Sequence, residues 1–176
     1  MSKRALFIGR FQPLHNGHLD ALAQILSHAE KFDEIVIGIG SAEKSFVPEN
    51  PLTCSERLEI WSLALQEKNI PRAKIWLIPI RDIERYSLWA FHVMEFCPDF
   101  QAVFSGSPLI RTLWEKALSG TGKQVFELEK RLSISATEVR EKIFSGQELE
   151  AVLPQSAVQF LEKIQLRERL AAIRNG

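Results

Sequence analysis

The sequence predicts an α/β fold in which five parallel strands form one sheet with helices on both faces. Short apolar runs alternate along the chain with segments whose apolar residues recur at helical spacing. Runs such as residues 34–40 are rich in β-branched residues, as buried parallel strands are. Alternation of this kind is joined by right-handed crossovers. We therefore expect a doubly wound parallel five-stranded sheet, followed by C-terminal helices.

The first half of the chain predicts two strands and two helices. Residues 5–8 form a short apolar run, and the apolar positions that follow at helical spacing predict a helix from about Gly17 to Ala29. The second strand covers residues 34–40. A polar loop at 43–51 contains two prolines that prevent a helix, and long loops of this kind are often functional. The next helix begins at Thr53 or Ser55, where the capping box is only partly matched.

Prolines set the limits of the elements in the second half. The third strand covers residues 74–80, and Pro79 marks its end because proline cannot donate to the ladder. A helix from about 88 to 96 stops before Pro98. After a fourth strand at 102–106, Pro108 stands at the start of a helix that runs to Leu118. The fifth strand covers residues 123–128.

The C-terminal third predicts two helices beyond the sheet. Ser135 and Glu138 have the spacing of a capping box, so a short helix begins there and ends near Gly146. Pro154 opens a last helix. Its predicted apolar face consists of Val158, Leu161, Ile164, Leu170 and Ile173. These helices either pack on the sheet or supply a subunit contact, and the sequence does not decide between the two.

Composition restricts the class of protein. The 176 residues fit a single domain, expected to span residues 1–176. Lys plus Arg and Asp plus Glu both number 22, and this balance argues against broad binding to nucleic acid or to a membrane surface. The cysteines, Cys54 and Cys97, are expected to be buried apolar residues. There is neither a signal-peptide pattern nor an apolar run of about 18–20 residues, so we expect a soluble cytoplasmic protein.

The turn between the first strand and the first helix, GRFQPLHNGH at residues 9–18, carries most of the candidate functional groups. Gly9 lets a ligand approach the backbone closely, and Gly17 opens the helix with free N–H groups that face an anion. His15 and His18 are three residues apart, so they share one face of the first helical turn. With Arg10, they make a site for a phosphate chain at the carboxyl end of a strand, where open α/β sheets bind ligands.

This turn has two other interpretations. A histidine near a helix start is usually a surface or capping residue. Two histidines at positions i and i+3 also suit a metal, but such a site needs a third ligand and the turn offers none. Phosphate binding is favoured over both, and we expect no metal site built from protein side chains alone.

A second candidate anion site lies near the other end of the chain. Ser135 caps a helix whose free N–H groups point toward whatever lies before it. Thr137 and Arg140 follow within reach of the same place. Ordinary capping and a surface arginine would explain this motif on its own. Paired with the first turn, it indicates a polyphosphate held between the two ends of the chain.

Both motifs resemble those of a known family. The first turn and the segment Ile134–Arg140 are similar to the His-x-Gly-His and Ile-Ser-x-Thr-x-x-Arg motifs of a nucleotidyltransferase superfamily. Within it, the chain most resembles the archaeal-type nicotinamide mononucleotide adenylyltransferases over nearly its whole length. The resemblance implies a Rossmann-like nucleotidyltransferase fold, and it implies transfer of AMP from ATP to nicotinamide mononucleotide to form NAD and pyrophosphate. It also implies Mg²⁺, held mainly by the ATP phosphates, and a homo-oligomer.

The same resemblance implies roles for individual residues. Arg10 bridges the phosphates of the two substrates, His15 and His18 contact those of ATP, and Arg140 helps to hold the triphosphate. The chemistry calls for charge neutralisation by Arg, Lys and protonated His rather than for a nucleophilic side chain. Trp89 either stacks on the nicotinamide ring or is a plain core aromatic. The other positions that match the family's substrate-binding pattern are Gly9, Phe11, Gln12, Gly17, Ser41, Arg57, Asp82, Ser105, Gly106, Ile134, Ser135 and Thr137.

The chain departs from the family's pattern at four positions. Phe46 stands where relatives have His, Glu49 where they have Lys or Arg, and Tyr86 and Ser107 where they have Asn. The first two concern loop contacts to phosphate, and the last two concern the nicotinamide and ribose contacts. The alternatives are therefore another acceptor, such as nicotinic acid mononucleotide, phosphopantetheine or FMN, and a nucleotide-binding regulatory module without catalysis.

Overall fold

The computed structural model describes residues 2–28 and 30–175 and contains the predicted parallel sheet. Its strands are β1 (Arg4–Gly9), β2 (Glu34–Ile39), β3 (Ile75–Pro79), β4 (Ala102–Ser105) and β5 (Gln124–Glu127). All neighbouring strands pair in parallel, in the order β3-β2-β1-β4-β5. The predicted doubly wound, Rossmann-like fold is confirmed.

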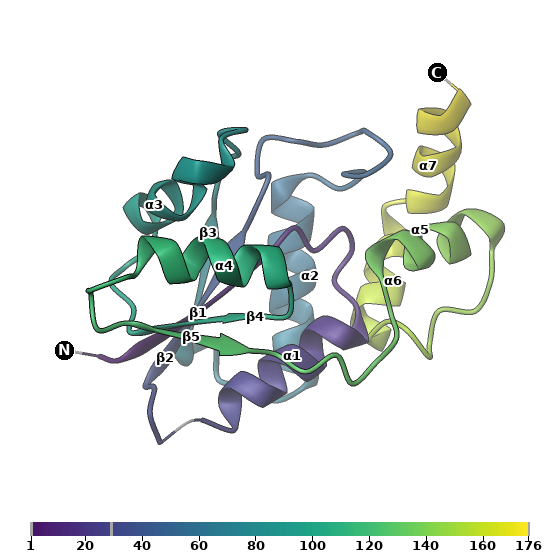
Figure 1. The fold of residues 1–176 in the computed structure, drawn as a ribbon. Helices are drawn as coiled ribbons and strands as arrows, with labels where there is room; N and C mark the ends of the chain where they lie inside the picture. Colours follow the sequence, from purple (N-terminus) through teal and green to yellow (C-terminus); the bar gives the residue numbers. More distant parts are fainter. Residues whose placement is uncertain (1, 29, 176) are drawn as a thin grey trace.

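Helices cover both faces of the sheet. They are α1 (Asn16–Leu26), α2 (Cys54–Glu67), α3 (Tyr86–Phe96), α4 (Pro108–Ala117), α5 (Ala136–Ser145), α6 (Gln155–Lys163) and α7 (Leu166–Asn175), with a 3₁₀ turn, η1 (Arg72–Lys74), before β3. Figure 1 shows α3 and α4 over one face, α1 and α2 over the other, and α5, α6 and α7 gathered beyond α1 and α2. The C-terminal helices thus pack against the helices of one face.

The central strands bury both of their faces. Leu6 and Val36 belong to the apolar core under α3 and α4, whereas Phe7 and Ile37 belong to the core under α1 and α2. All four side chains are at most 6% exposed. This two-sided burial explains why these strands are continuous apolar runs rather than alternating patterns.

Local capping fixes where two of the helices begin. Thr53 caps α2, where its hydroxyl accepts from the Glu56 N–H, and Ser135 caps α5 through the same arrangement with Glu138. The predicted box at Ser135 is therefore confirmed, and the start of α2 is the earlier of the two positions expected. Gly146, which ends α5, has the left-handed conformation (φ +65°) that favours glycine at this position.

Two predicted helix limits are wrong. The first helix ends at Leu26, followed by Ser27, whose hydroxyl donates to the Gln24 carbonyl; the predicted end at Ala29 lies outside the described residues. The last helix is two helices, because Gln165 takes a left-handed conformation (φ +52°) between α6 and α7. Leu161 and the buried Leu166 are five residues apart, a spacing that one straight helix cannot bury on one face.

The carboxyl ends of the strands meet at one edge of the sheet. Gly9 of β1 pairs with Ile39 of β2, and Phe7 pairs with Phe104 of β4. The strand order reverses at β1, which lies between β2 and β4. At such a point the connections diverge to opposite faces and leave a crevice in which open α/β sheets bind ligands.

Within residues 2–28 and 30–175, none of the helices has the length and apolar character needed to cross a membrane.

Candidate active site

A cavity of about 820 Å³ lies at this edge of the sheet, a volume typical of small-molecule sites. It is formed by the segments that follow β1, β2, β3 and β4, together with the start of α3. The predicted site residues on its wall are Gly9, Arg10, Ser41, Asp82, Trp89, Ser105 and Gly106. The cavity therefore collects candidates from segments as far apart as residues 9 and 106.

The two histidines lie together at the start of α1, and neither is among the residues that line this cavity. Their rings stack with centroids 3.6 Å apart, and His15, which precedes the helix, is 6% exposed. The His15 N–H donates to Nδ1 of His18 at 3.2 Å. A Cβ at Gly17 would come within 3.1 Å of the His15 ring, so glycine leaves room for that ring against the helix.

Both imidazoles are neutral at pH 7. Burial lowers the pKa of His15 to about 4. Burial also lowers the pKa of His18 well below 6.5, and the neighbouring His15 lowers it further. Because Nδ1 of His18 accepts a hydrogen bond, its proton sits on Nε2, which can donate to a phosphate oxygen. In the chain without substrate, burial disfavours the charged form of both imidazoles, which differs from the protonated histidine that the chemistry was expected to call for.

Acid should destabilise the fold through His15. The unfolded chain takes up a proton on this residue below pH 6.5, whereas the folded chain does so only near pH 4. Stability therefore falls as the pH falls from about 6.5 to about 4, by about 3 kcal/mol from this residue. Urea unfolding of the wild type and of His15→Asn across this range should show that the difference between their free energies of unfolding becomes smaller as the pH falls. His92→Gln, on α3, is the matched control, and parallel curves for wild type and His15→Asn would contradict the assignment.

Two predicted binding residues of the turn are buried behind it. Phe11 is 2% exposed and packs edge-on against His18 and Trp61, with ring centroids 4.8 and 4.9 Å away. Gln12 is 1% exposed; its amide nitrogen donates to the Leu52 carbonyl, and its amide oxygen accepts from the Leu52 N–H. These side chains hold the shape of the turn and support the imidazoles rather than line the cavity.

Arg57 likewise lies beneath the site and not on its wall. This guanidinium group on α2 is 1% exposed and donates to four backbone carbonyls. The acceptors are Thr53 (3.2 Å), Arg10 (3.0 Å), Gly40 (2.7 Å) and Ser41 (3.1 Å). One buried side chain thus joins the loop after β1 to the loop after β2.

The wall beyond β2 and β3 is held by a polar network. The Ser41 hydroxyl donates to the Asp82 carboxylate at 2.7 Å, and Lys44 lies 3.4 Å from the same carboxylate. Trp89 borders the cavity while its ring packs edge-on against Trp114, with centroids 5.6 Å apart. Trp89 therefore belongs both to the core under α3 and α4 and to the cavity wall, so the two interpretations of this residue are compatible.

The start of α5 is docked onto the first turn. Arg140, 8% exposed, donates to the Gln12 carbonyl at 2.9 Å and to the Thr137 hydroxyl at 3.2 Å. An added Cβ at Gly17 would lie 3.9 Å from the Ile134 side chain. The two motifs, at opposite ends of the sequence, therefore form one structure in the folded chain.

Three arginines share this region. Burial lowers the pKa values of the guanidinium groups of Arg57 and Arg140, and the charge of Arg10 close by lowers both further. None of the three forms an ion pair with a carboxylate among the residues that the structure describes. Arginines remain charged in proteins, so this cluster is a positive centre that favours an anion, although the carboxylates of Glu43 near Arg57 and of Glu49 and Glu141 near Arg140 offset part of its charge.

Comparison with known proteins identifies the family. The model of the cytidylyltransferase-like family matches residues 6–142, which include the first turn and the start of α5. The chain belongs to the cytidylyltransferase-like family. It is 41% identical over 167 residues to a curated nicotinamide-nucleotide adenylyltransferase of Thermococcus sibiricus, which covers 95% of this chain and 87% of the relative. A protein of the same name from Thermococcus kodakarensis is 39% identical over 170 residues, or 97% and 88% of the two chains. The predicted resemblance to archaeal-type enzymes is confirmed.

Solved structures of low identity share the fold. A bifunctional NMN adenylyltransferase/ADP ribose pyrophosphatase from Francisella tularensis superimposes with a TM-score of 0.78 at 20% identity. The match covers 99% of this chain and 54% of that one, so this cytidylyltransferase-like chain spans about half the length of the bifunctional protein. The same protein has been solved in complex with AMP and a manganese ion.

Several residues on the cavity wall of this cytidylyltransferase-like chain were not predicted. They are Lys44, Asn50, Glu84, Arg85 and Ile110, with Phe7 and Ile8 of β1 and Gly40 after β2. Tyr86 and Ser107, two of the positions that depart from the family's pattern, also lie on the wall. The sequence could have indicated Lys44 and Asn50 as wall residues, because the loop at 43–51 is long and directly follows a strand.

Both cysteines are partly buried. Burial raises the pKa of the Cys97 thiol to about 12 and also raises the pKa of the Cys54 thiol.

Proposed function

We propose that the chain transfers AMP from ATP to the 5′-phosphate of nicotinamide mononucleotide and releases NAD and pyrophosphate. The observation that carries the proposal is the positive centre of Arg10, Arg57 and Arg140 next to a cavity large enough for a nucleotide. The curated relatives, at up to 41% identity over most of the chain, are adenylyltransferases of this substrate.

The reaction joins two anions and needs no activated side chain. A non-bridging oxygen of the acceptor's phosphate attacks the α-phosphorus of ATP, and the bond from that phosphorus to the bridging oxygen of pyrophosphate breaks. The phosphate is ionised at neutral pH, so no general base is required. The work that remains is to align two like-charged groups and to stabilise the charge on the departing pyrophosphate.

We assign these tasks to four side chains. Arg10, exposed on the cavity wall, neutralises the phosphates of both substrates. His18 donates from Nε2, and Arg140 holds the beginning of α5 against the turn so that its free N–H groups face the triphosphate. Arg57, with its donors directed at carbonyls, keeps the loops after β1 and β2 in register.

Mg²⁺ enters this scheme with ATP. It supplies charge neutralisation on the triphosphate and is held mainly by phosphate oxygens and water, as Mg²⁺ usually is. The donor set fits this role: Asp82 on the cavity wall already binds Ser41 and Lys44, and no cluster of three His, Cys, Asp or Glu side chains in the described ranges could hold a metal. We also propose that the chain is a single domain, that it acts in the cytoplasm and that it forms a homo-oligomer. Light scattering of the purified chain would measure the oligomeric state.

The test is an acceptor panel. The protein is incubated with ATP, Mg²⁺ and nicotinamide mononucleotide, nicotinic acid mononucleotide, phosphopantetheine or FMN, and pyrophosphate release is followed. Pyrophosphate and NAD with the nicotinamide nucleotide are the expected products. If only another acceptor gives turnover, that acceptor is the substrate and the reaction is still adenylyl transfer. ATP binding without turnover with any acceptor would indicate a regulatory module and contradict the proposal.

A further inference from the structure

Arg169, on the C-terminal helix α7, forms a two-pronged ion pair with Glu56 in the first turn of α2. Both N–O distances are 2.7 Å, and the two side chains are only 17% and 16% exposed. Burial raises the pKa of the Glu56 carboxyl, but hydrogen bonds from Arg169 and Thr53 lower it by more, so the group is ionised at neutral pH. A planar pair of this kind fixes direction as well as distance. It therefore ties α7 to one place at the start of α2.

The same guanidinium group also contacts the loop at 43–51. It donates to the Pro51 carbonyl at 3.1 Å, and its central carbon lies 4.7 Å from the centroid of the Phe46 ring. A cation over the face of an aromatic ring is attracted to it. Glu56 in turn accepts from the Thr53 N–H at 2.8 Å. One side chain of α7 thus reaches the middle of the loop, its end and the cap of the helix that follows it.

The loop has a conformation that requires support from outside. Phe46 has a left-handed backbone (φ +56°), which is unfavourable for a residue with a side chain and persists only where surrounding contacts hold it. The Phe46 side chain is itself exposed. Within the loop, Val47 and Asn50 exchange two backbone hydrogen bonds of 3.0 and 3.4 Å. The guanidinium group over the Phe46 ring supplies a contact from outside the loop at the strained residue.

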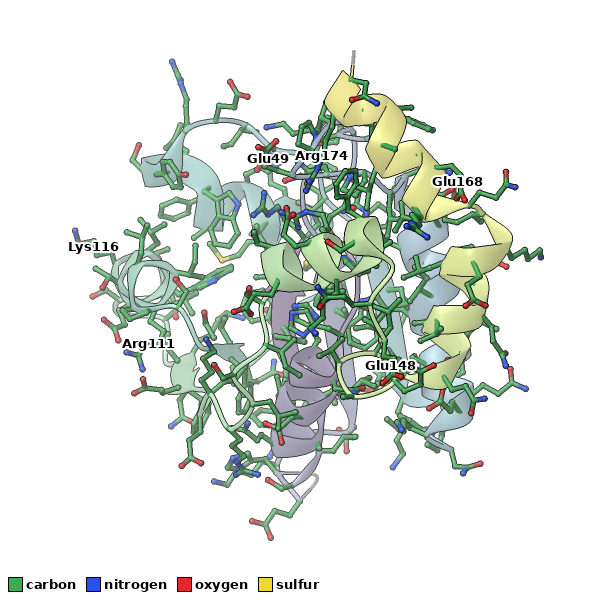
Figure 2. All side chains as sticks on the ribbon, turned by 90° about the vertical axis from the view of Figure 1, so that its right-hand side faces the viewer. Glu49, Arg111, Lys116, Glu148, Glu168 and Arg174 are labelled. Atoms are coloured by element: carbon green, nitrogen blue, oxygen red, sulfur yellow. The ribbon has the colours of Figure 1, made fainter. Side chains whose placement is uncertain are left out.

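α7 is a rigid base for this contact. Leu166 and Leu170 are each 1% exposed and belong to the core under α1 and α2. Glu49 of the loop and Arg174 near the end of α7 lie in the same part of Figure 2, and the charges of both act on Arg140. The loop and α7 therefore approach each other near α5.

The loop also forms part of the cavity wall. Lys44 and Asn50 line the cavity, and the Lys44 ammonium group lies 3.4 Å from the carboxylate of Asp82, another wall residue. We infer that Arg169 is a positioning residue that holds the loop at 43–51 in place as a wall of the substrate cavity. Its effect on kinetics rests on the proposed function.

Hydrogen exchange tests whether Arg169 holds the loop. Arg169→Met removes the charge and the planar donors but keeps most of the side-chain volume. In the substrate-free protein, NMR should show the amides of Val47 and Asn50 exchanging at least about 10-fold faster than in the wild type, because local opening of the loop becomes easier. The slow amides of β2 report global stability. A rise at the loop beyond the rise in β2 therefore measures local release.

Steady-state kinetics tests whether the held loop serves the site. In folded Arg169→Met, the KM for nicotinamide mononucleotide should rise about 10-fold while kcat changes less, because the loop borders the cavity and none of its residues is assigned to the transfer step. If Arg169 had only a structural role, the free energy of unfolding would fall and both constants of the folded protein would stay the same. Phe46→Leu keeps the ion pair and removes only the ring, so it should change exchange and KM in the same direction by less.

Arg167→Met is the matched control, because it removes the same charge from the same helix. Arg167 is exposed and donates to the Phe144 carbonyl in α5 at 3.3 Å, so its loss should leave loop exchange and KM unchanged. Unchanged loop exchange in both Arg169→Met and Phe46→Leu would overturn the inference, as would faster exchange with an unchanged KM. A wild type without turnover of nicotinamide mononucleotide would contradict the proposed function instead, and the exchange rates would still decide whether Arg169 holds the loop.

Discussion

His18→Ala is expected to lower turnover by about 10²–10³-fold, the usual cost of removing one donor that stabilises developing charge. The imidazole is neutral and its proton sits on Nε2, because Nδ1 accepts from the His15 N–H. It is thus a fixed donor that needs no reorientation when pyrophosphate leaves. KM for ATP should change less than turnover, because the contact strengthens as charge develops.

Two further variants separate the donor from its structural support. His18→Asn keeps a group at the Nδ1 position that can accept from the His15 N–H but removes the donor at Nε2, so it should fold normally and be as slow as His18→Ala. His18→Gln places an amide near the Nε2 position and should recover part of the turnover. Steady-state kinetics would measure the turnover of these variants, with His92→Ala as the control variant. Near-normal turnover in a folded His18→Ala or His18→Asn protein would rule out the role.

Much of the fold follows from local patterns in the sequence. The strands are continuous apolar runs because the sheet buries both faces, and the capping box at Ser135 specifies where α5 begins. The break at Gln165 has no glycine or proline to signal it, and it appears only when Leu161 and Leu166 must both be buried. That requirement comes from packing against α2 and α5 and has no local signature.

Part of the candidate site likewise follows from the residue types in the sequence, and part depends on the folded chain. The residue types in the first turn indicate an anion site, because glycine, arginine and histidine at a strand end have few other uses together. Their protonation state does not follow from type, because it depends on how deeply the folded chain buries His15 and His18. Arg57 resembled a binding residue in sequence, yet its partners are carbonyls of two loops that meet only in the folded sheet.

Arg57→Met should have the largest effect on stability, about 3–5 kcal/mol, because several carbonyls lose a charged donor at a buried position. The loss arises from unpaired acceptors in the loops after β1 and β2 rather than from lost apolar contact, since methionine fills most of the same space. Urea unfolding would measure it. Arg72→Met is the control, because the exposed Arg72 also donates to a carbonyl, that of Ile75, but at the opposite edge of the sheet.

Arg57→Lys tests whether the two loops must be held together for catalysis. An ammonium group keeps the charge but lacks the planar fork that reaches the Arg10, Gly40 and Ser41 carbonyls at once. This variant should therefore regain part of the stability while turnover stays at least about 10-fold low, because a small displacement of Arg10 misaligns the two phosphates. If Arg57 had only a structural role, turnover of Arg57→Lys would recover to the same extent as its free energy of unfolding. An Arg57→Lys protein with full turnover would show that the loops hold their register without the fork.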